Sequence, residues 1–155
     1  MHHPLATARG AVTGGLVPRS LAQRRTMQEA SKASNRKQAA ISFLKLAASG
    51  NVSEAYGNYI SPTFRHHNPY FAGDAESLKK GMAEAAAKFP DTTLEVQNVF
   101  EEGDLVAVHS RVQHGPDEPE ISVVHIFRYE GERIAEMWDV GMEAPKESPN
   151  ENGMF

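Results

Sequence analysis

The sequence predicts an α+β fold in which three helices pack on a curved, mostly antiparallel sheet. Apolar residues recur at helical spacing between about residues 35 and 89, and they alternate with polar residues between residues 92 and 140. Short turns that contain glycine separate the alternating stretches, which is typical of antiparallel hairpins. Helices that precede such a sheet in the chain pack together on one of its faces.

The length and composition of the chain exclude several protein classes. With 155 residues the chain can form one domain with a hydrophobic core. It contains no cysteine, so neither a disulfide framework nor thiolate chemistry is available. No apolar run approaches the roughly 20 residues of a membrane-spanning helix. We therefore expect a soluble, cytoplasmic protein without a membrane partner.

The distribution of charge argues against nucleic-acid binding. Four of the sixteen basic residues precede Met27, in a stretch without any acidic residue. The remaining chain holds twelve basic and twenty acidic residues, which is a formal charge of −8. Contacts to phosphates need clustered lysine and arginine side chains. We therefore expect no nucleic-acid partner.

Residues 1–34 are expected to form a disordered leader, because they are rich in small and polar residues without a periodic apolar face. Three origins remain open for this leader. Residues 16–20 resemble a thrombin-cleavage segment of an expression vector, the acid-free stretch resembles a transit peptide, and Met27 is an alternative start. The predicted domain spans residues 35–143, and residues 144–155 form a C-terminal tail.

The first two predicted helices follow the leader. The first begins near Asn35 and carries Phe43 and Leu44 on its apolar face. It ends before Gly50, since glycine commonly follows the last residue of a helix. The second predicted helix is short and covers residues 52–58.

An irregular segment separates the second helix from the third. Residues 63–72 are expected to be extended or irregular, because Pro69 disfavours helical geometry at Asn68. Asp74 is suited to cap the N-terminus of the third helix. Pro90 stops that helix, since proline cannot continue it.

Four strands are expected after the third helix. Each alternates apolar and polar residues, and tight turns join successive strands into hairpins. The turns are Gly103-Asp104, Gly115-Pro116-Asp117 and Gly131-Glu132. The expected strands cover residues 92–100, 105–113, 121–129 and 134–140.

Four short motifs occur in a defined order along the chain: His67-Asn68-Pro69, Gly103-Asp104-Leu105-Val106-Ala107-Val108-His109, Ile126-Phe127-Arg128 and Trp138-Asp139. Over about residues 37–155 the chain thereby resembles the SnoaL-like polyketide cyclase family of the nuclear transport factor 2-like superfamily. The resemblance implies a cone-shaped α+β barrel with a pocket between sheet and helices, and a homodimer. It does not by itself imply an active enzyme, because one fold hosts many functions.

Asp139 is the first candidate catalytic residue. It lies on the last predicted strand among apolar neighbours, including Met137 and Val140. A carboxyl group in such a setting can take a proton next to a carbonyl group and return it. The resemblance implies the same role, since SnoaL-like cyclases use an Asp at this place. The alternative is a structural Asp that pairs with an arginine or caps the strand.

His125 is the second candidate, because the resemblance implies a functional His at this place. A two-residue turn at Gly131-Glu132 would set Asp139 opposite Val124, which leaves His125 on the other face of the sheet. Only a bulge or a longer turn would bring His125 and Asp139 to one face. The alternative is a His on the outer face of the sheet, at a dimer interface.

His66 and His67 are adjacent, so in an extended backbone their side chains point in opposite directions. They therefore cannot share a metal ion, and no other residues supply a recognisable ligand spacing. We expect no metal site. His67 matches the His-Asn-Pro motif of the family and is expected to face the pocket. The alternative is a His67 that bonds to the backbone and fixes the turn at Asn68-Pro69.

The remaining candidates for a substrate pocket are apolar or amide side chains. An aromatic and apolar pocket would suit a small hydrophobic molecule. The apolar members are equally well explained as ordinary core. These candidates are Tyr59, Asn68, Phe71, Met82 and Met137.

These observations favour an enzyme that transfers protons on a hydrophobic carbonyl compound without an organic cofactor. The resemblance implies intramolecular aldol condensation of a polyketide, with Asp139 as the base and a neighbouring His assisting. Isomerase, dehydratase or epoxide hydrolase chemistry in the same pocket is an alternative. The epoxide hydrolase alternative has less support, because limonene epoxide hydrolase uses an Asp-Arg-Asp set and this sequence shows no clear second pocket Asp. A non-catalytic ligand-binding or dimerisation module is the alternative outside enzymes.

Overall fold

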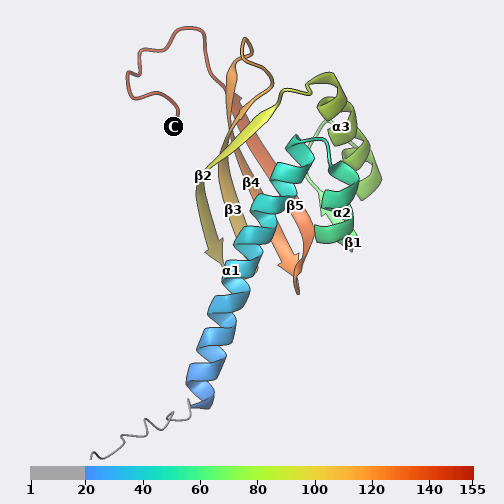
Figure 1. Ribbon diagram of the computed structural model, residues 1–155, viewed down its shortest axis with the longest axis vertical. Helices are drawn as coiled ribbons and strands as arrows, with labels where there is room; N and C mark the ends of the chain where they lie inside the picture. Colours follow the sequence, from blue (N-terminus) through green and yellow to red (C-terminus); the bar gives the residue numbers. More distant parts are fainter. Residues whose placement is uncertain (1–19) are drawn as a thin grey trace, which may run out of the picture.

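The computed structural model describes residues 20–155 of the chain. Within these residues the helices and strands follow in an order that places most helices first (Figure 1). The helices are α1 (Leu21–Ala48), α2 (Val52–Tyr59) and α3 (Ala75–Lys88). The strands are β1 (Ile60–His66), β2 (Thr93–Glu102), β3 (Leu105–Gln113), β4 (Glu120–Glu130) and β5 (Arg133–Glu143).

The strands form one five-stranded sheet in the order β1-β5-β4-β3-β2. Neighbouring strands are antiparallel, except that β1 runs parallel to β5. The three helices lie on one face of the curved sheet (Figure 1). The predicted α+β class and the mostly antiparallel sheet are thereby confirmed. The sheet is open, with β1 and β2 at its edges, so the described residues do not close the barrel that the resemblance implied.

Helix α1 begins fourteen residues before the predicted start at Asn35. The hydroxyl of Ser20 accepts a hydrogen bond from the backbone N–H of Gln23, and the Gln23 side chain accepts one from the N–H of Ser20. This reciprocal cap starts the helix at Leu21. Residues 20–32 are exposed, and this part of α1 projects away from the sheet (Figure 1). Residues 21–34, which were expected to belong to a disordered leader, are helical in the structure, and residues 1–19 lie outside the described part.

Strand β1 was not predicted as a strand, because residues 63–72 were expected to be extended or irregular and Pro62 interrupts the pattern. In the structure β1 pairs with β5, but the register shifts between Ile60 and Arg65. The shift disturbs the alternation of buried and exposed residues along β1. The period-two signal that identifies a strand from sequence is therefore weak here.

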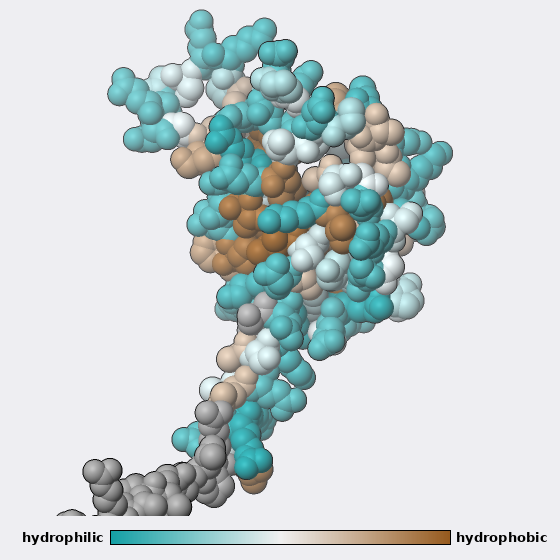
Figure 2. Space-filling view, viewed as in Figure 1, coloured by the Kyte–Doolittle hydropathy of each residue, from teal (hydrophilic) through white to brown (hydrophobic). Residues whose placement is uncertain are grey.

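The hydrophobic core lies between the helices and the face of the sheet that carries Phe127 and Met137, which we call the inner face. Phe43 of α1 packs edge-on against Phe127, with ring centroids 5.8 Å apart. Phe43, Phe127 and Met137 are all almost fully buried. Apolar residues gather over the strands beside α1 (Figure 2). The opposite face, which carries Ile126 and Trp138, is the outer face.

A bulge in β5 decides which residues share the inner face. Tyr129 of β4 pairs with Ile134, whereas Arg128 pairs with Glu136, so Ala135 is an extra residue in β5. Beyond Ala135 every β5 side chain is turned to the face opposite to the one that an unbroken register would give. The sequence named a bulge as the condition for bringing His125 and Asp139 together, and the structure contains it.

Within residues 20–155 no helix combines the length and the apolar character that crossing a membrane requires.

Candidate active site

His125 and Asp139 lie directly opposite each other on neighbouring strands. His125 of β4 pairs with Asp139 of β5, two residues along from the pair of Phe127 with Met137. Directly opposed residues of an antiparallel pair share one face, so both side chains lie on the inner face with the core. The structure thus brings together the two candidates that the sequence could not place on one face.

Asn68 holds the carboxylate of Asp139. Its side-chain Nδ2 donates a hydrogen bond of 2.8 Å to Oδ2 of Asp139. The other end of the amide, Oδ1, accepts a hydrogen bond from the backbone N–H of Tyr70. This second bond orients the amide, so that the N–H group points at Asp139. Asn68, a predicted pocket residue, is therefore a positioning residue for the carboxylate.

The ring of His125 is enclosed by apolar groups. Nδ1 is buried and makes no hydrogen bond within residues 20–155. Burial lowers the pKa of His125 to about 4, while the negative charge of Asp139 acts in the opposite direction. His125 is therefore neutral at pH 7, with one nitrogen carrying a proton and the other accepting. Such a ring can exchange hydrogen bonds with a bound molecule without presenting a charge.

An apolar cavity of about 250 Å³ adjoins His125. It lies between α1 and α3 on one side and the inner face of β2, β3 and β4 on the other. Its polar groups are few: His125, His114 and Thr92. The other lining residues are Leu44, Ala47, Ala48, Met82, Ala85, Ala86, Leu94, Val112, Ile121 and Val123. A cavity of this kind suits a hydrophobic molecule that carries a small number of polar groups.

The other predicted pocket residues are dispersed. Met82 lines the cavity beside His125. Met137 lies in the core, almost fully buried, and does not line this cavity. Phe71 packs its ring against Gly81 of α3 instead of lining the cavity. Tyr59 lines a different cavity, beside the middle of α1.

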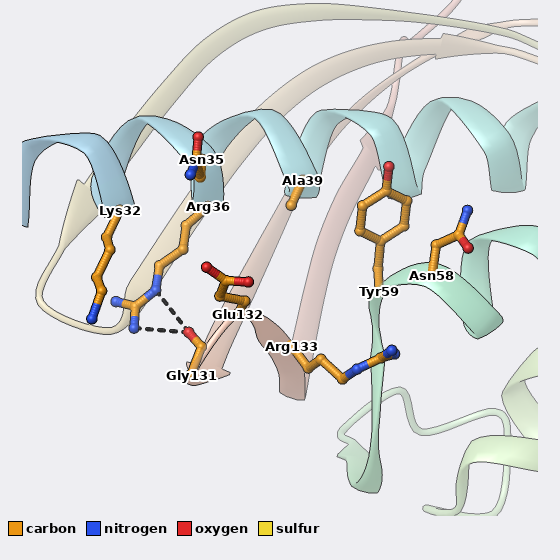
Figure 3. A pocket seen from close by; sticks show the side chains of 9 residues that line it. All are labelled: Lys32, Asn35, Arg36, Ala39, Asn58, Tyr59, Gly131, Glu132 and Arg133. Carbon is orange, nitrogen blue, oxygen red and sulfur yellow. Dashed lines mark hydrogen bonds between the residues drawn. The ribbon is translucent and has the colours of Figure 1, made fainter. Parts of the chain in front are cut away.

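This second cavity, of about 390 Å³, lies where α1 meets the turn between β4 and β5 (Figure 3). Figure 3 shows Arg36 pointing from α1 to the carbonyl oxygen of Gly131. The same guanidinium donates to the carbonyl oxygen of Gly103 in the preceding hairpin turn. Tyr59 stands at the far wall of this cavity, away from the pair formed by His125 and Asp139. Of the polar groups that line this cavity, Arg36 holds two hairpin turns in place.

His66 and His67 occupy opposite faces, as the sequence predicted for neighbours on a strand. His66 is the one that faces inward, whereas His67 was expected to face the pocket. His66 is buried on the inner side, where its Nδ1 accepts from the N–H of Asn68 and its Nε2 donates to the carbonyl oxygen of Ala72. His66 therefore fixes the turn at Asn68-Pro69, a role that the sequence offered to His67. His67 lies on the outer face, so the expectation that it faces the pocket is corrected.

His67 belongs to an ion cluster on the outer face, which was not predicted. Its Nε2 lies 2.8 Å from Oε1 of Glu136, and its ring stacks on Trp138 with centroids 4.8 Å apart. Arg65 and Arg128 also donate to the carboxylate of Glu136. Their hydrogen bonds, Arg65 first, lower the pKa of Glu136 to about 2. The only sequence signal for this cluster is an acid inside an apolar strand.

Among residues 20–155 no group of three or more histidine, cysteine or carboxylate side chains is arranged to hold a metal ion. His114 and Thr92 are the polar lining residues of the cavity that the sequence analysis missed. His114 lies between the strand predicted to end at Gln113 and the turn at Gly115, although alternation along β3 places it on the face of Val112.

A model of the SnoaL-like domain family matches residues 40–137. The chain belongs to the SnoaL-like domain family. The matched residues include the whole of β1, α3, β3 and β4, and they end two residues before Asp139. The predicted family is thereby confirmed. A search of the curated proteins found no match.

Solved structures agree with the SnoaL-like fold. AclR from Streptomyces galilaeus, a candidate hydroxylase, is 22% identical, with a TM-score of 0.61 over 70% of this chain and 79% of its own. A candidate polyketide cyclase from Acidithiobacillus ferrooxidans is 23% identical, with a TM-score of 0.56 over 69% and 87%. A cystatin-fold protein from Novosphingobium aromaticivorans is 21% identical, with a TM-score of 0.57 over 68% and 97%. Likenesses at these identities show the fold.

Proposed function

We propose that this SnoaL-like protein is an enzyme that moves a proton at carbon next to the carbonyl group of a small hydrophobic compound. The observation that carries the proposal is the pairing of Asp139 on the inner face with a neutral His125, which lines an apolar cavity. A carboxylate and a hydrogen-bond donor at one place are what enolate formation requires. Polyketide cyclisation by aldol condensation is the chemistry that the family and the named neighbour favour.

We propose the following steps. Oδ2 of Asp139 accepts a hydrogen bond from Asn68. In the proposed step, the other oxygen, Oδ1, therefore takes the α-proton of the substrate. The electrons of the broken C–H bond pass to the carbonyl oxygen, and an N–H of His125 stabilises the resulting enolate. The enolate carbon then forms a C–C bond with a second carbonyl carbon of the same molecule. The new alkoxide recovers the proton from Asp139, so the enzyme is restored.

The α-proton step can be tested without the natural substrate. We expect the protein to accelerate deuterium uptake by the methyl group of 2-acetonaphthone in D₂O, followed by NMR. Asp139→Asn keeps the shape of the side chain but cannot exchange a proton at neutral pH. It should lower the rate above buffer by a factor of about 10² or more. Asp117→Asn, in the exposed turn after β3, is the matched control and should keep the full rate.

Each alternative predicts a different outcome. A non-catalytic binding module would bind the ketone but would not accelerate exchange in either protein. A structural Asp139 would leave the rate unchanged in Asp139→Asn while lowering the melting temperature. Full exchange activity in Asp139→Asn would remove Asp139 from the mechanism.

We also propose that the protein is a homodimer that associates through the outer face of the sheet. Val140 and Met142 of β5 are 71% and 65% exposed, and both lie on the face of Trp138 and Ile126. A contiguous apolar surface on the uncovered face of a sheet supports association with a second copy. A dimer of this kind would leave the inner cavity of each subunit free for its ligand.

A further inference from the structure

We propose that His114 is a second polar anchor for the ligand, at the end of the cavity away from His125. It would accept a hydrogen bond from a hydroxyl group of the ligand. The ligand class is then a compound of one or two rings with a carbonyl group at one end and a hydroxyl group at the other. The position of the carbonyl end rests on the proposed function, whereas the hydroxyl end rests on His114 alone.

The hydrogen bonds around His114 fix which of its nitrogens carries the proton. The hydroxyl of Thr92 donates to the carbonyl oxygen of Phe89 at 2.8 Å, which uses its only proton. Thr92 Oγ1 also lies 3.1 Å from Nδ1 of His114, so in this bond Nδ1 is the donor. In neutral His114 the remaining nitrogen, Nε2, is therefore an acceptor. Nε2 of His114 accepts no hydrogen bond from any residue between 20 and 155.

The ring of His114 is also held in one plane. It stacks on Phe89, with ring centroids 4.6 Å apart and an interplanar angle of 21°. A ring fixed by stacking on one side and by a hydrogen bond at Nδ1 loses little further freedom when it binds a ligand. His114 is thus an acceptor that is already oriented at the wall of the cavity.

The two histidines are too far apart to bind one polar group. His125 lies opposite Val108, and His114 follows Val108 by six residues on the same inner face. At about 3.3 Å per residue, their Cα atoms are at most roughly 20 Å apart along the strand, and the two side chains shorten this gap because both line the same cavity. Apolar side chains, including Val112 and Val123, line the space between them. A ligand that satisfies both ends must therefore carry two polar groups on an apolar body.

The volume limits the size of that body. Pockets for drug-sized ligands measure roughly 300–1,000 Å³, and this cavity measures about 250 Å³. It therefore fits one or two rings better than a larger polycyclic compound. A carboxylate at the far end would bring no proton for Nε2 at pH 7, so a hydroxyl is favoured over an acid.

Two fluorescent ketones that differ only in the far hydroxyl test the inference: 6-hydroxy-2-acetonaphthone and 2-acetonaphthone. Fluorescence titration at pH 7 should give the wild-type protein a preference of about 5- to 10-fold for the hydroxylated probe, which is the size of one hydrogen bond. His114→Phe keeps the stacking on Phe89 but removes the acceptor. It should abolish the preference and leave the affinity for 2-acetonaphthone unchanged.

Two further variants separate recognition from stability. His109→Phe is the matched control, because His109 lies on the outer face of the same strand. It should keep the preference. Thr92→Val removes the acceptor for Nδ1 and should reduce the preference to about 2-fold, since the tautomer of His114 is no longer fixed. It remains informative even if His114→Phe does not fold.

Three outcomes would overturn the inference: equal affinity of the wild-type protein for both probes, an unchanged preference in His114→Phe, or no binding of either probe. The deuterium exchange of Asp139→Asn tests the proposed chemistry separately. Equal affinity for the two probes with intact exchange would refute only the role of His114. A preserved preference without exchange in any variant would refute only the catalytic proposal.

Discussion

Two opposing effects act on the pKa of His125. Asp139, directly opposite, favours the protonated ring, whereas the apolar surroundings favour the neutral ring. The effect of burial is larger, because the free energy lost on removing the charged ring from water exceeds the free energy gained from one neighbouring carboxylate. The result is a neutral hydrogen-bonding ring next to an ionisable acid, a combination that separates the roles of donor and base.

This burial predicts a pH dependence of stability. Between pH 6.5 and about 4 the unfolded chain binds a proton at His125 that the folded chain does not. The free energy of unfolding should therefore be highest above pH 6.5 and fall as the pH decreases, by about 2 kcal/mol at pH 5. His125→Gln should show a smaller decrease between pH 7 and pH 5 in urea denaturation.

The pH range of this comparison lies above the range in which Glu136 titrates. Arg65 and its neighbours stabilise ionised Glu136, so that contribution is lost only between about pH 4.5 and pH 2. His109→Gln, on the outer face, should retain the wild-type decrease. An identical decrease in His125→Gln and the wild-type protein would contradict the burial of a neutral His125.

The identity of the catalytic candidates could be predicted from sequence, but the face of each side chain could not. Asp139 and His125 follow from apolar surroundings and family resemblance. The position of both side chains on one face depends on the bulge at Ala135. An alanine in a strand gives no sequence signal for a bulge. The exchange of roles between His66 and His67 has the same origin, since a shift of one residue turns every side chain of a strand to the other face.

At the scale of the elements, Arg36 joins the long helix to the sheet. Its guanidinium donates to the carbonyl oxygens of Gly103 and Gly131, which belong to the β2–β3 and β4–β5 turns. It also lies over the ring of Tyr129, 5.6 Å from the centroid. The planar group of an arginine can serve two acceptors at once. Arg36 thereby fixes the position of α1 over the inner cavity.

Arg36→Lys should destabilise the fold although it conserves the charge. A lysine ammonium cannot reach both turns with the same geometry, so at least one carbonyl oxygen loses its partner. We expect the free energy of unfolding in urea to fall by roughly 1–2 kcal/mol. Arg25→Lys is the control on the same helix, where the exposed pair with Glu29 should tolerate the exchange. Equal stability of the two variants would mean that Arg36 does not hold the turns.

The elements themselves were predictable where local chemistry acts alone. Asp74 caps α3 through the N–H of Ser77, as its residue type indicated. The strand of residues 105–113 was predicted with its observed bounds, because its alternation is unbroken. Sequence-based prediction failed where tertiary contacts determine the secondary structure. Strand β1 forms because it pairs in parallel with β5, with a shifted register and despite Pro62.

At the scale of the whole molecule, the two faces of the sheet have different surroundings. The inner face is covered by the helices. On the outer face, Phe155 of the C-terminal tail stacks on His109 and lies over Arg111, which covers part of β3. In the outer-face patch, formed by Ile126, Trp138, Val140 and Met142, the ring of His67 covers part of Trp138, whereas Val140 and Met142 remain exposed. A second copy related by two-fold symmetry could bury this patch against itself.

The dimer proposal is best tested at Val140, whose side chain is 71% exposed and therefore contributes little to the fold of one subunit. Sedimentation at micromolar concentration should give about twice the mass of the chain for the wild-type protein. Val140→Lys places two like charges at the centre of the proposed interface, so it should shift the protein to monomer without lowering the unfolding free energy by more than about 0.5 kcal/mol. Ala83→Lys, on the exposed side of α3, adds the same charge far from the patch and should remain dimeric. If Val140→Lys stays dimeric, the subunits meet elsewhere, and the apolar outer-face patch needs a different occupant.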